Sequence, residues 1–440
     1  MLNPTPVDPT LVDETHASDA QIPTTPVGFG FQFTLFLANV VVWLLFYPLT
    51  TILYPQQATN IDASHKEVVL SIALTISSLI GLGLVPLVGI LSDRTRTPIG
   101  RRRPWMLFAS ILFIVGFIVL AQATSLVLFT IGIVVVGIAN GILSTAFNAI
   151  IPDHVPEQQR GTVSGWVGLA TPVSLVISAL LVPRVLAQTG GSLHLAYYLL
   201  IVPVVAILIP YALFLHDTAL PSTRTPPLDK RGPSRRFGID FRLYSNFGFV
   251  CITRFLLILG FNIGTAYLLF YLHDVVHYEQ LFPGHKAAEG VASLQLISVA
   301  GLIVATILGG ILSDRIHNRK LVVMVSSALI GVGLLTLAIA HTWTAALIGA
   351  VFLGLGFGAY LAVDAALATL VLPHQEHRAR DLAFVAVSGN IGILLAPIVA
   401  AVFITSFGLE KAQAYTMLFV MAGILAVFAA ILVQPIKGVR

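Results

Sequence analysis

The chain contains 440 residues, of which 57% are hydrophobic and only 10% are charged, and its mean hydropathy is +0.92. Because soluble domains carry roughly 25% charged residues, this composition excludes a water-soluble fold. The formal charge of +4 lies mostly in short polar segments between apolar runs, so it indicates membrane topology and does not predict a nucleic-acid partner. The single cysteine, Cys251, excludes an intramolecular disulfide.

Residues 1–28 precede the first apolar run and contain four acidic residues but no Lys or Arg. A cleavable signal peptide needs a basic start and an early apolar core. We therefore expect this segment to be a disordered cytoplasmic tail, and the first apolar helix to be the signal for membrane insertion.

Apolar runs follow, each long enough to cross a membrane as a helix. About 20 helical residues span a hydrocarbon core of roughly 30 Å. The runs lack the alternation of barrel strands, which leaves helices as the structure that satisfies its backbone in lipid. The sequence predicts an all-α membrane protein with twelve transmembrane helices, at 29–54, 67–91, 105–123, 126–151, 161–187, 196–215, 246–272, 289–312, 321–340, 344–371, 382–406 and 413–434.

The distribution of Lys and Arg predicts the orientation of these helices. If both termini are cytoplasmic, the cytoplasmic segments hold 19 of the 24 Lys and Arg residues. The opposite orientation would leave inside only Lys66, Lys286, Lys411 and, near a helix end, Arg184, which contradicts the positive-inside rule. We expect a multi-pass protein of the cytoplasmic or plasma membrane with both termini in the cytoplasm.

An internal repeat divides the helices into two sets of six. The six residues GILSDR at 89–94 recur at 310–315, an offset of 221 residues, and Pro152 recurs at the same offset as Pro373. The segment between the sets is polar, basic and rich in Pro, as expected of a linker. The predicted organisation is a tail at 1–28, a six-helix bundle at 29–215, a cytoplasmic linker at 216–245, a second six-helix bundle at 246–434 and a tail at 435–440.

The repeated loop resembles the signature loop of the major facilitator superfamily. Its first copy, 89–94, is followed by GRRRP at 100–104, and its second copy, 310–315, is followed by Arg319 and Lys320. The resemblance implies two halves repeated in parallel orientation, with a substrate site between them near the middle of the membrane.

An Asp at a helix end beside several Arg residues can bridge neighbouring helix termini, so we predict a cytoplasmic gate in these loops. The alternative is that the residues only set the membrane topology. The predicted gate residues are Asp93, Arg94, Gly100, Arg101, Arg102, Asp314, Arg315 and Arg319.

The first copy of the loop, SDRTRTPIGRRRP at 92–104, is similar to the version in glycoside/cation symporters and in sucrose/proton symporters. This resemblance implies cation-coupled uptake of a sugar or glycoside. Melibiose-type members of the group carry acidic residues in helix 2 that build a sodium site, whereas segment 67–91 has no acid between its ends. A proton is therefore the expected coupling ion, and no cofactor is expected.

One acid and one base stand out at membrane depth, where a charge costs at least about 2.5–3.5 kcal/mol. Asp364 follows a Gly-rich stretch, and Arg254 lies about eight residues into its helix, so that each is roughly 12 Å deep. The family resemblance places both helices beside the central cavity. We predict that Arg254 and Asp364 interact across it and that Asp364 couples proton movement to transport. Alternatively, Asp364 only holds helices together, and Arg254 binds an anionic solute.

Sugars are bound by hydrogen-bonding side chains together with aromatic faces. The substrate-binding candidates at membrane depth are Asn39, Asn140, Asn148, Asn262, Tyr267, Tyr360 and Asn390. Each could instead bond between helices or anchor the membrane interface. Three His residues, at 273, 277 and 285, share one loop without compact ligand spacing, so we expect no metal site there.

The leading hypothesis is a secondary active transporter that moves a small polar solute by proton-coupled symport through alternating access. A proton-coupled exporter of drugs or metabolites is the first alternative, because the signature loop does not set direction. An enzyme or receptor is disfavoured, since no nucleophile with a base lies at membrane depth and the repeat favours alternating access. The expected partners are a small-molecule substrate and the lipid bilayer, with no nucleic acid, and the chain is expected to act as a monomer.

Overall fold

The computed structural model describes residues 25–95, 97–215, 245–316, 318–370 and 378–435. The predicted tails and linker therefore lie largely outside the described residues. The side chains of three predicted gate residues, Asp93, Arg94 and Asp314, are also outside the description.

Helices account for nearly all of the described chain. In the first half they are α1 (Phe29–Leu44), η3 (Leu49–Leu53), α2 (Tyr54–Ile61), α3 (Lys66–Arg94), α4 (Arg103–Ala121), α5 (Leu126–His154), α6 (Glu157–Gln188), α7 (Leu193–Pro203), η4 (Val204–Leu208) and α8 (Ile209–Phe214). In the second half they are α9 (Ser245–Ala266), α10 (Leu268–Asp274), α11 (Tyr278–Leu281), α12 (Ala287–Ile316), α13 (Arg319–Ile339), α14 (Trp343–Leu370), α15 (Arg378–Ser406) and α16 (Lys411–Leu432).

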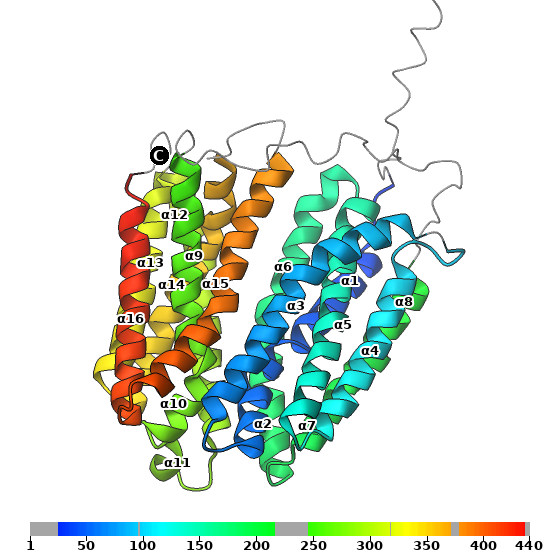
Figure 1. The fold of residues 1–440 in the computed structure, drawn as a ribbon. Helices are drawn as coiled ribbons and strands as arrows, with labels where there is room; N and C mark the ends of the chain where they lie inside the picture. Colours follow the sequence, from blue (N-terminus) through cyan, green and yellow to red (C-terminus); the bar gives the residue numbers. More distant parts are fainter. Residues whose placement is uncertain (1–24, 96, 216–244, 317, 371–377, 436–440) are drawn as a thin grey trace, which may run out of the picture.

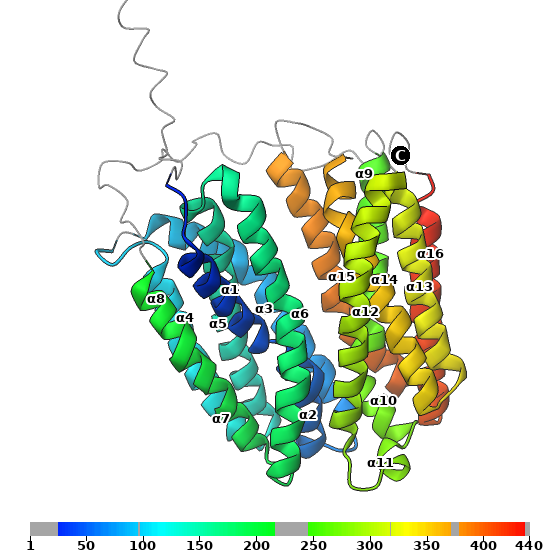
Figure 2. The same cartoon turned by 180° about the vertical axis from the view of Figure 1, so that it is seen from behind.

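These helices form twelve spans that are long and apolar enough to cross a membrane. Figure 1 shows the elements from α1 to α8 as one bundle beside a second bundle made of α9 to α16, and Figure 2 shows the same division from behind. The predicted fold class is thereby confirmed.

The first span differs most from its predicted bounds, since it continues to Ile61 instead of ending near Tyr54. The sequence stretch after Tyr54 is polar and reads as a loop. In the structure, the Gln57 side chain is buried and donates a hydrogen bond to the carbonyl of Ala123, which lets a polar turn remain helical inside the bundle.

Two prolines each precede a widened helical turn. Pro48 immediately precedes the π-helical turn η3, and Pro203 immediately precedes η4. A proline lacks the N–H that would continue the α-helical ladder, and a local π turn absorbs the mismatch without ending the span.

The Gly-rich part of α14 packs directly against α12. A Cβ atom added to Gly354 or Gly358 would collide with the backbone of Ser298 or Leu302, respectively. Thr306 Oγ1 also donates to the carbonyl of Gly358 at 3.1 Å. Small residues thus allow close backbone approach, as in other membrane helix pairs, and fix the position of α14 in its bundle.

The two ends of the molecule differ in how the bundles meet. At the end where α3 and α12 begin, which we call the closed end, side chains of the two bundles bond to one another. At the other end, which we call the basic end, the ribbons of the two bundles diverge in both views. Five glycines on three helices face open space, because a Cβ added to any of them would meet nothing within 4 Å beyond its own helix. They are Gly81 and Gly83 of α3, Gly165 and Gly168 of α6 and Gly310 of α12.

Candidate functional site

Three polar side chains meet between α9 and α14 inside the second bundle. Arg254 Nη1 donates to Asp364 Oδ2 at 2.5 Å, and Tyr360 Oη donates to Asp364 Oδ1 at 2.5 Å. Tyr360 stands one helical turn before Asp364, which places both on one face of α14. We call Arg254, Tyr360 and Asp364 the Asp364 cluster. Both oxygens of its carboxylate are bonded to donors from the same bundle.

The predicted contact between Arg254 and Asp364 is therefore present. Helices α9 and α14 both belong to the second bundle, where the sequence analysis put them, and their position beside a central cavity stays a prediction. The Arg254 side chain is 26% exposed and the Asp364 side chain 13%. The two side chains are thus only partly buried.

Helix α15 packs against the guanidinium of Arg254. A Cβ on Gly389 would lie 3.0 Å from Arg254 Nε, which is closer than nearly all real contacts of this kind. Nε itself is buried and has no hydrogen-bond partner among the described residues. Leaving a buried donor unpaired typically costs about 1–3 kcal/mol of stability. An acceptor that enters the site and bonds to Nε would remove this cost.

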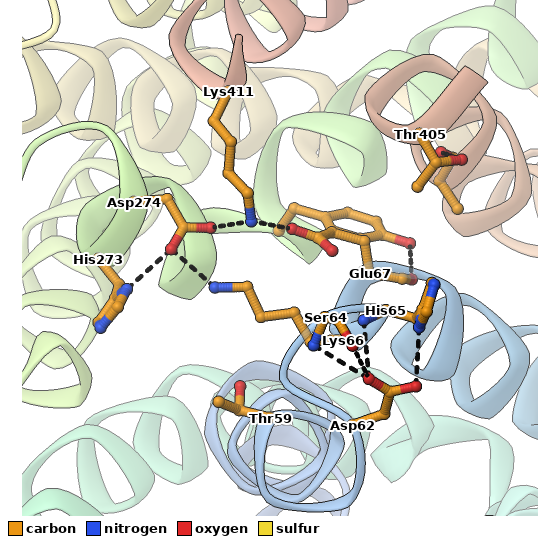
Figure 3. Close-up of polar contacts among 12 residues, drawn as sticks. Thr59, Asp62, Ser64, His65, Lys66, Glu67, His273, Asp274, Thr405 and Lys411 are labelled. Carbon is orange, nitrogen blue, oxygen red and sulfur yellow. Dashed lines mark hydrogen bonds and ion pairs between the residues drawn. The ribbon is translucent and has the colours of Figure 1, made fainter. Parts of the chain in front are cut away.

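A second group of charged residues joins the bundles at the closed end (Figure 3). Lys66 Nζ donates to Asp274 Oδ1 at 2.7 Å, and Lys411 Nζ donates to Asp274 Oδ2 at 3.0 Å and to Glu67 Oε1 at 2.9 Å. We call these four residues the closed-end network. Lys66 and Glu67 come from the first bundle, and Asp274 and Lys411 come from the second, so the network holds the two bundles together.

Three of the four charged side chains in the closed-end network are buried. Lys66, Glu67 and Asp274 are 6%, 4% and 9% exposed, whereas Lys411 is 48% exposed. Burial alone raises the pKa of the Asp274 carboxyl, but the hydrogen bonds from Lys66 and His273 and the Lys66 charge outweigh it and hold the pKa below its usual value. The Asp274 carboxyl is therefore ionised at neutral pH.

Local structure fixes the start of α3, where Lys66 and Glu67 lie. Asp62 Oδ1 accepts hydrogen bonds from the backbone N–H of Ser64 and of His65, each at 3.0 Å, which forms a tight turn between α2 and α3. The bond from the Ser64 hydroxyl and the bonds from His65 lower the pKa of Asp62. Glu67 then stands in the first turn of α3, where the helix dipole favours an acid.

Tyr267 reinforces the closed end from the break between α9 and α10. Its side chain is fully buried, and its hydroxyl lies 3.2 Å from the carbonyl oxygen of Glu67 and 3.0 Å from that of Pro397. The sequence prediction made Tyr267 a substrate-binding candidate. In this conformation the hydroxyl is instead committed to backbone atoms of α3 and α15.

A third group, at the basic end, lies within the first bundle. Asp153 Oδ2 accepts Arg101 Nη2 at 2.6 Å and Arg102 Nε at 3.1 Å, and Arg102 Nη1 donates to Ser92 Oγ at 2.8 Å. Gly100 has φ of 110°, a conformation that side-chain-bearing residues rarely adopt, which turns the chain back toward α4. These contacts link the ends of α3 and α5 to the start of α4.

Two further predicted gate residues lie at the second copy of the loop, where α12 meets α13. Arg315 belongs to the last turn of α12, and Arg319 begins α13. Each of them interacts with other residues of the protein. The gating role of the eight predicted residues stays a prediction.

The other substrate-binding candidates do not gather at one point. Asn39 and Asn262 each donate to a carbonyl one turn earlier in their own helix, at 2.9 and 2.8 Å. Asn140 lines a cavity of about 10 Å³ inside the first bundle, room for one water molecule. Asn148 and Asn390 are exposed on α5 and α15. Only Tyr360 lies in the Asp364 cluster, and the substrate role of each stays a prediction.

Sequence reasoning missed the closed-end network and the acceptor Asp153. The network residues lie at the ends of spans, where a charge is expected to contact water or lipid headgroups. A signal was nevertheless present, because Lys66, Glu67, Asp274 and Lys411 are two bases and two acids predicted on the same side of the membrane. Such a balanced set can pair between helices.

The profile described as Major Facilitator Superfamily matches residues 32–305 and 285–437, which together cover almost the whole described chain. The chain belongs to this superfamily. It is a membrane transporter and not an enzyme, as the sequence predicted.

Known proteins similar to this superfamily member include a general alpha-glucoside permease of Schizosaccharomyces pombe. The two are 34% identical over an alignment of 119 residues, and the match covers 23% of this chain and 22% of the permease. The match thus spans less than a quarter of that relative.

Several solved transporter structures have a similar fold. A variant of the nucleoside transporter NupG has a TM-score of 0.71 at 13% identity, covering 92% of this chain and 99% of the other. A peptide transporter of the POT type has a TM-score of 0.73 at 13% identity, covering 94% and 96%. A bacterial homologue of the human lysosomal transporter Spinster has a TM-score of 0.67 at 15% identity, covering 93% and 97%. At these identities the likeness establishes the fold alone.

Proposed function

We propose that this protein imports a sugar or glycoside together with a proton, by alternating access. The observation that carries the proposal is the Asp364 cluster, in which a membrane-depth carboxylate is bonded to Arg254 and Tyr360. The partial match to an alpha-glucoside permease supports a sugar-like substrate. The loop at 92–104, with its resemblance to glycoside and sucrose symporters, supports the same class.

The Asp364 cluster offers a simple route from protonation to conformational change. An ionised Asp364 accepts from both Arg254 and Tyr360, as observed. When a proton binds the carboxylate, its charge is lost and the attraction to the guanidinium weakens. Arg254 then has donors free for solute hydroxyls, in addition to the unpaired Nε. Proton and solute would therefore favour each other's binding, which is the requirement for symport.

We assign the basic end to the cytoplasm, with both chain termini on that side, because the positive residues gather there. The structure then corresponds to an inward-facing state, in which the bundles are joined at the outer, closed end. Solute entry from outside requires the closed-end network to break. The Arg101 and Arg102 contacts to Asp153 lie within the first bundle and are already present in this state, so closing the cytoplasmic side requires other contacts, between the bundles.

A proton fits the available acids better than sodium does. The acid at the start of α3 is Glu67, and its carboxylate is already bonded to Lys411 at the closed end. Sodium prefers several oxygen ligands, and an acid paired with a lysine is a poor one. Asp364, with a bonded Arg and Tyr, is suited to exchange a proton.

Sugar uptake into membrane vesicles tests this proposal. Radiolabelled sugars and glycosides should accumulate when the outside is acidic, and a protonophore should abolish the accumulation. If the protein exports drugs or metabolites instead, no sugar will accumulate, and an imposed proton gradient will drive a lipophilic substrate out. The second result would replace the importer with the exporter.

A further inference from the structure

A cavity of about 220 Å³ lies at the closed end beside the closed-end network, between the two bundles. The first bundle lines it with Gln56, Thr59 and Asn60 of α2, and the second with His273, Glu279 and Lys286. Its volume is below the roughly 300–1,000 Å³ of pockets for drug-sized molecules, so it suits a smaller solute. Lys66 also borders the cavity, which connects it physically to the network.

The groups that line the cavity favour a neutral polar ligand over an ion. The positive charge of Lys66 is balanced by Asp274, to which it is bonded at 2.7 Å. Lys286 and Glu279 then contribute one charge of each sign. The amides of Gln56 and Asn60 add both donors and acceptors. This mixture matches a molecule with many hydroxyl groups, which both donates and accepts hydrogen bonds without a net charge.

The cavity depends on the bundles being together. Lys286, from the second bundle, lies so close to Gly191 of the first that a Cβ there would be 2.5 Å from Nζ. Gly191 has φ of 89°, so the turn between α6 and α7 uses a conformation that suits glycine and makes room for the lysine. When the closed end opens, the two sets of lining residues must separate.

We propose that this cavity is a second binding site, on the outer face, for a small neutral polyhydroxylated solute such as a monosaccharide or its methyl glycoside. The site exists only while the closed end is shut. A solute bound there stabilises the inward-facing state by mass action and slows the return to the outward-facing one. The inference rests on the proposed function for the class of solute and for alternating access.

Protection of a cysteine in the cavity tests the proposal. Thr59→Cys, in a Cys251→Ser background, places a thiol in the lining. The change should disturb the structure little, because the Thr59 hydroxyl that it removes bonds to the Pro55 carbonyl of its own helix. Intact cells are treated with a membrane-impermeant maleimide in the presence of methyl α-D-glucoside, glucose or mannitol. At a solute concentration ten times the Kd for the cavity, about one tenth of the sites stay free, so the maleimide should label the cysteine about tenfold more slowly.

Variants separate the cavity from the transport site. Asn60→Ala and Gln56→Ala remove lining amides and should each weaken protection, whereas Gln413→Ala, exposed on α16 away from the lining, should not. Protection should persist with Asp364→Asn, even though that variant is expected not to couple protons. Absence of protection by all three solutes overturns the second site while leaving the vesicle assay of transport to stand on its own. Protection that disappears with Asp364→Asn but survives both lining variants also overturns it, because the signal would then come from the transport site.

Discussion

At the scale of single residues, the hydroxyl of Tyr360 is the contact that distinguishes the Asp364 cluster from a plain ion pair. A hydrogen bond to a charged group contributes about 1.5–3 kcal/mol. Tyr360→Phe removes this bond and leaves Arg254 in place, so we expect the initial rate of proton-driven sugar uptake to fall about tenfold or more. Tyr415→Phe is a matched control, because the Tyr415 hydroxyl is buried without a partner among the described residues. Equal loss in both variants would contradict a specific role for Tyr360.

The position of Arg254 depends on residue 389 being a glycine, which has no side chain. Gly389→Ala adds a Cβ that would lie 3.0 Å from Arg254 Nε, so either the guanidinium or α15 must move. We expect uptake to fall while the protein remains folded in the membrane, as judged by its monodisperse elution after solubilisation. Gly30→Ala, which meets nothing within 4 Å, controls for the change in helix propensity. Normal uptake by Gly389→Ala would show that the Arg254 geometry is not critical.

The Asp364 cluster also marks the limit of sequence reasoning about residues. Asp364 and Arg254 could be selected from the sequence because a charge at membrane depth is costly and rare. Their similar depth in two helices predicted the contact, which the structure contains. The part played by Gly389 could not be predicted, since it depends on how closely α15 approaches α9, and no sequence pattern specifies that distance.

At the scale of helices, the closed-end network connects the start of α3 to α10 and α16 (Figure 3). Removing one partner of a buried ion pair costs about 3–5 kcal/mol. Asp274→Asn should therefore shift the protein away from the closed-end conformation. A cysteine replacing Ser71, which is 7% exposed in α3, should become labelled by an outside maleimide at least about tenfold faster. Glu410→Gln, which changes an exposed acid whose side chain makes no cap hydrogen bond to α16, is the control, and equal labelling rates in the two variants would exclude the network as a gate.

The pH dependence of this gate follows from the lowered pKa of Asp274. A depressed pKa means that the ionised carboxylate stabilises the closed end above its ordinary pKa of about 3.9, and that this contribution is lost only as pH falls through the lowered value. Labelling at position 71 should therefore stay constant when the outside pH changes between about 5 and 8. Proton-dependent transport over this range must then originate elsewhere, and a strong pH effect on labelling would contradict this assignment.

Helix positions were more predictable than helix ends. Hydropathy located every span because a lipid core demands about 20 apolar residues. It failed after Tyr54, where α2 continues the first span through polar residues that bond inside the protein. It also gave no sign that α9 and α10 are separate helices with the buried Tyr267 between them. Both features depend on partners more than 60 residues away in sequence.

At the scale of the whole molecule, the three polar groups are distributed differently over the two bundles. The Asp364 cluster lies entirely in the second bundle, and the Asp153 contacts lie entirely in the first. The closed-end network is shared by both. A proton that changes the second bundle can therefore affect the whole molecule only through contacts between bundles, and the closed-end network supplies such contacts.

The decisive measurement is the proton movement that accompanies solute entry. De-energised cells in a lightly buffered medium receive a panel of sugars and glycosides, and the outside pH is recorded for the native protein and for Asp364→Asn. We predict that at least one sugar makes the medium more alkaline with the native protein and that the response disappears in the variant, although the variant is present in the membrane in equal amount. A sugar response that is unchanged in Asp364→Asn would contradict the role of the Asp364 cluster, and the absence of a response to every sugar would contradict the sugar/proton symporter itself.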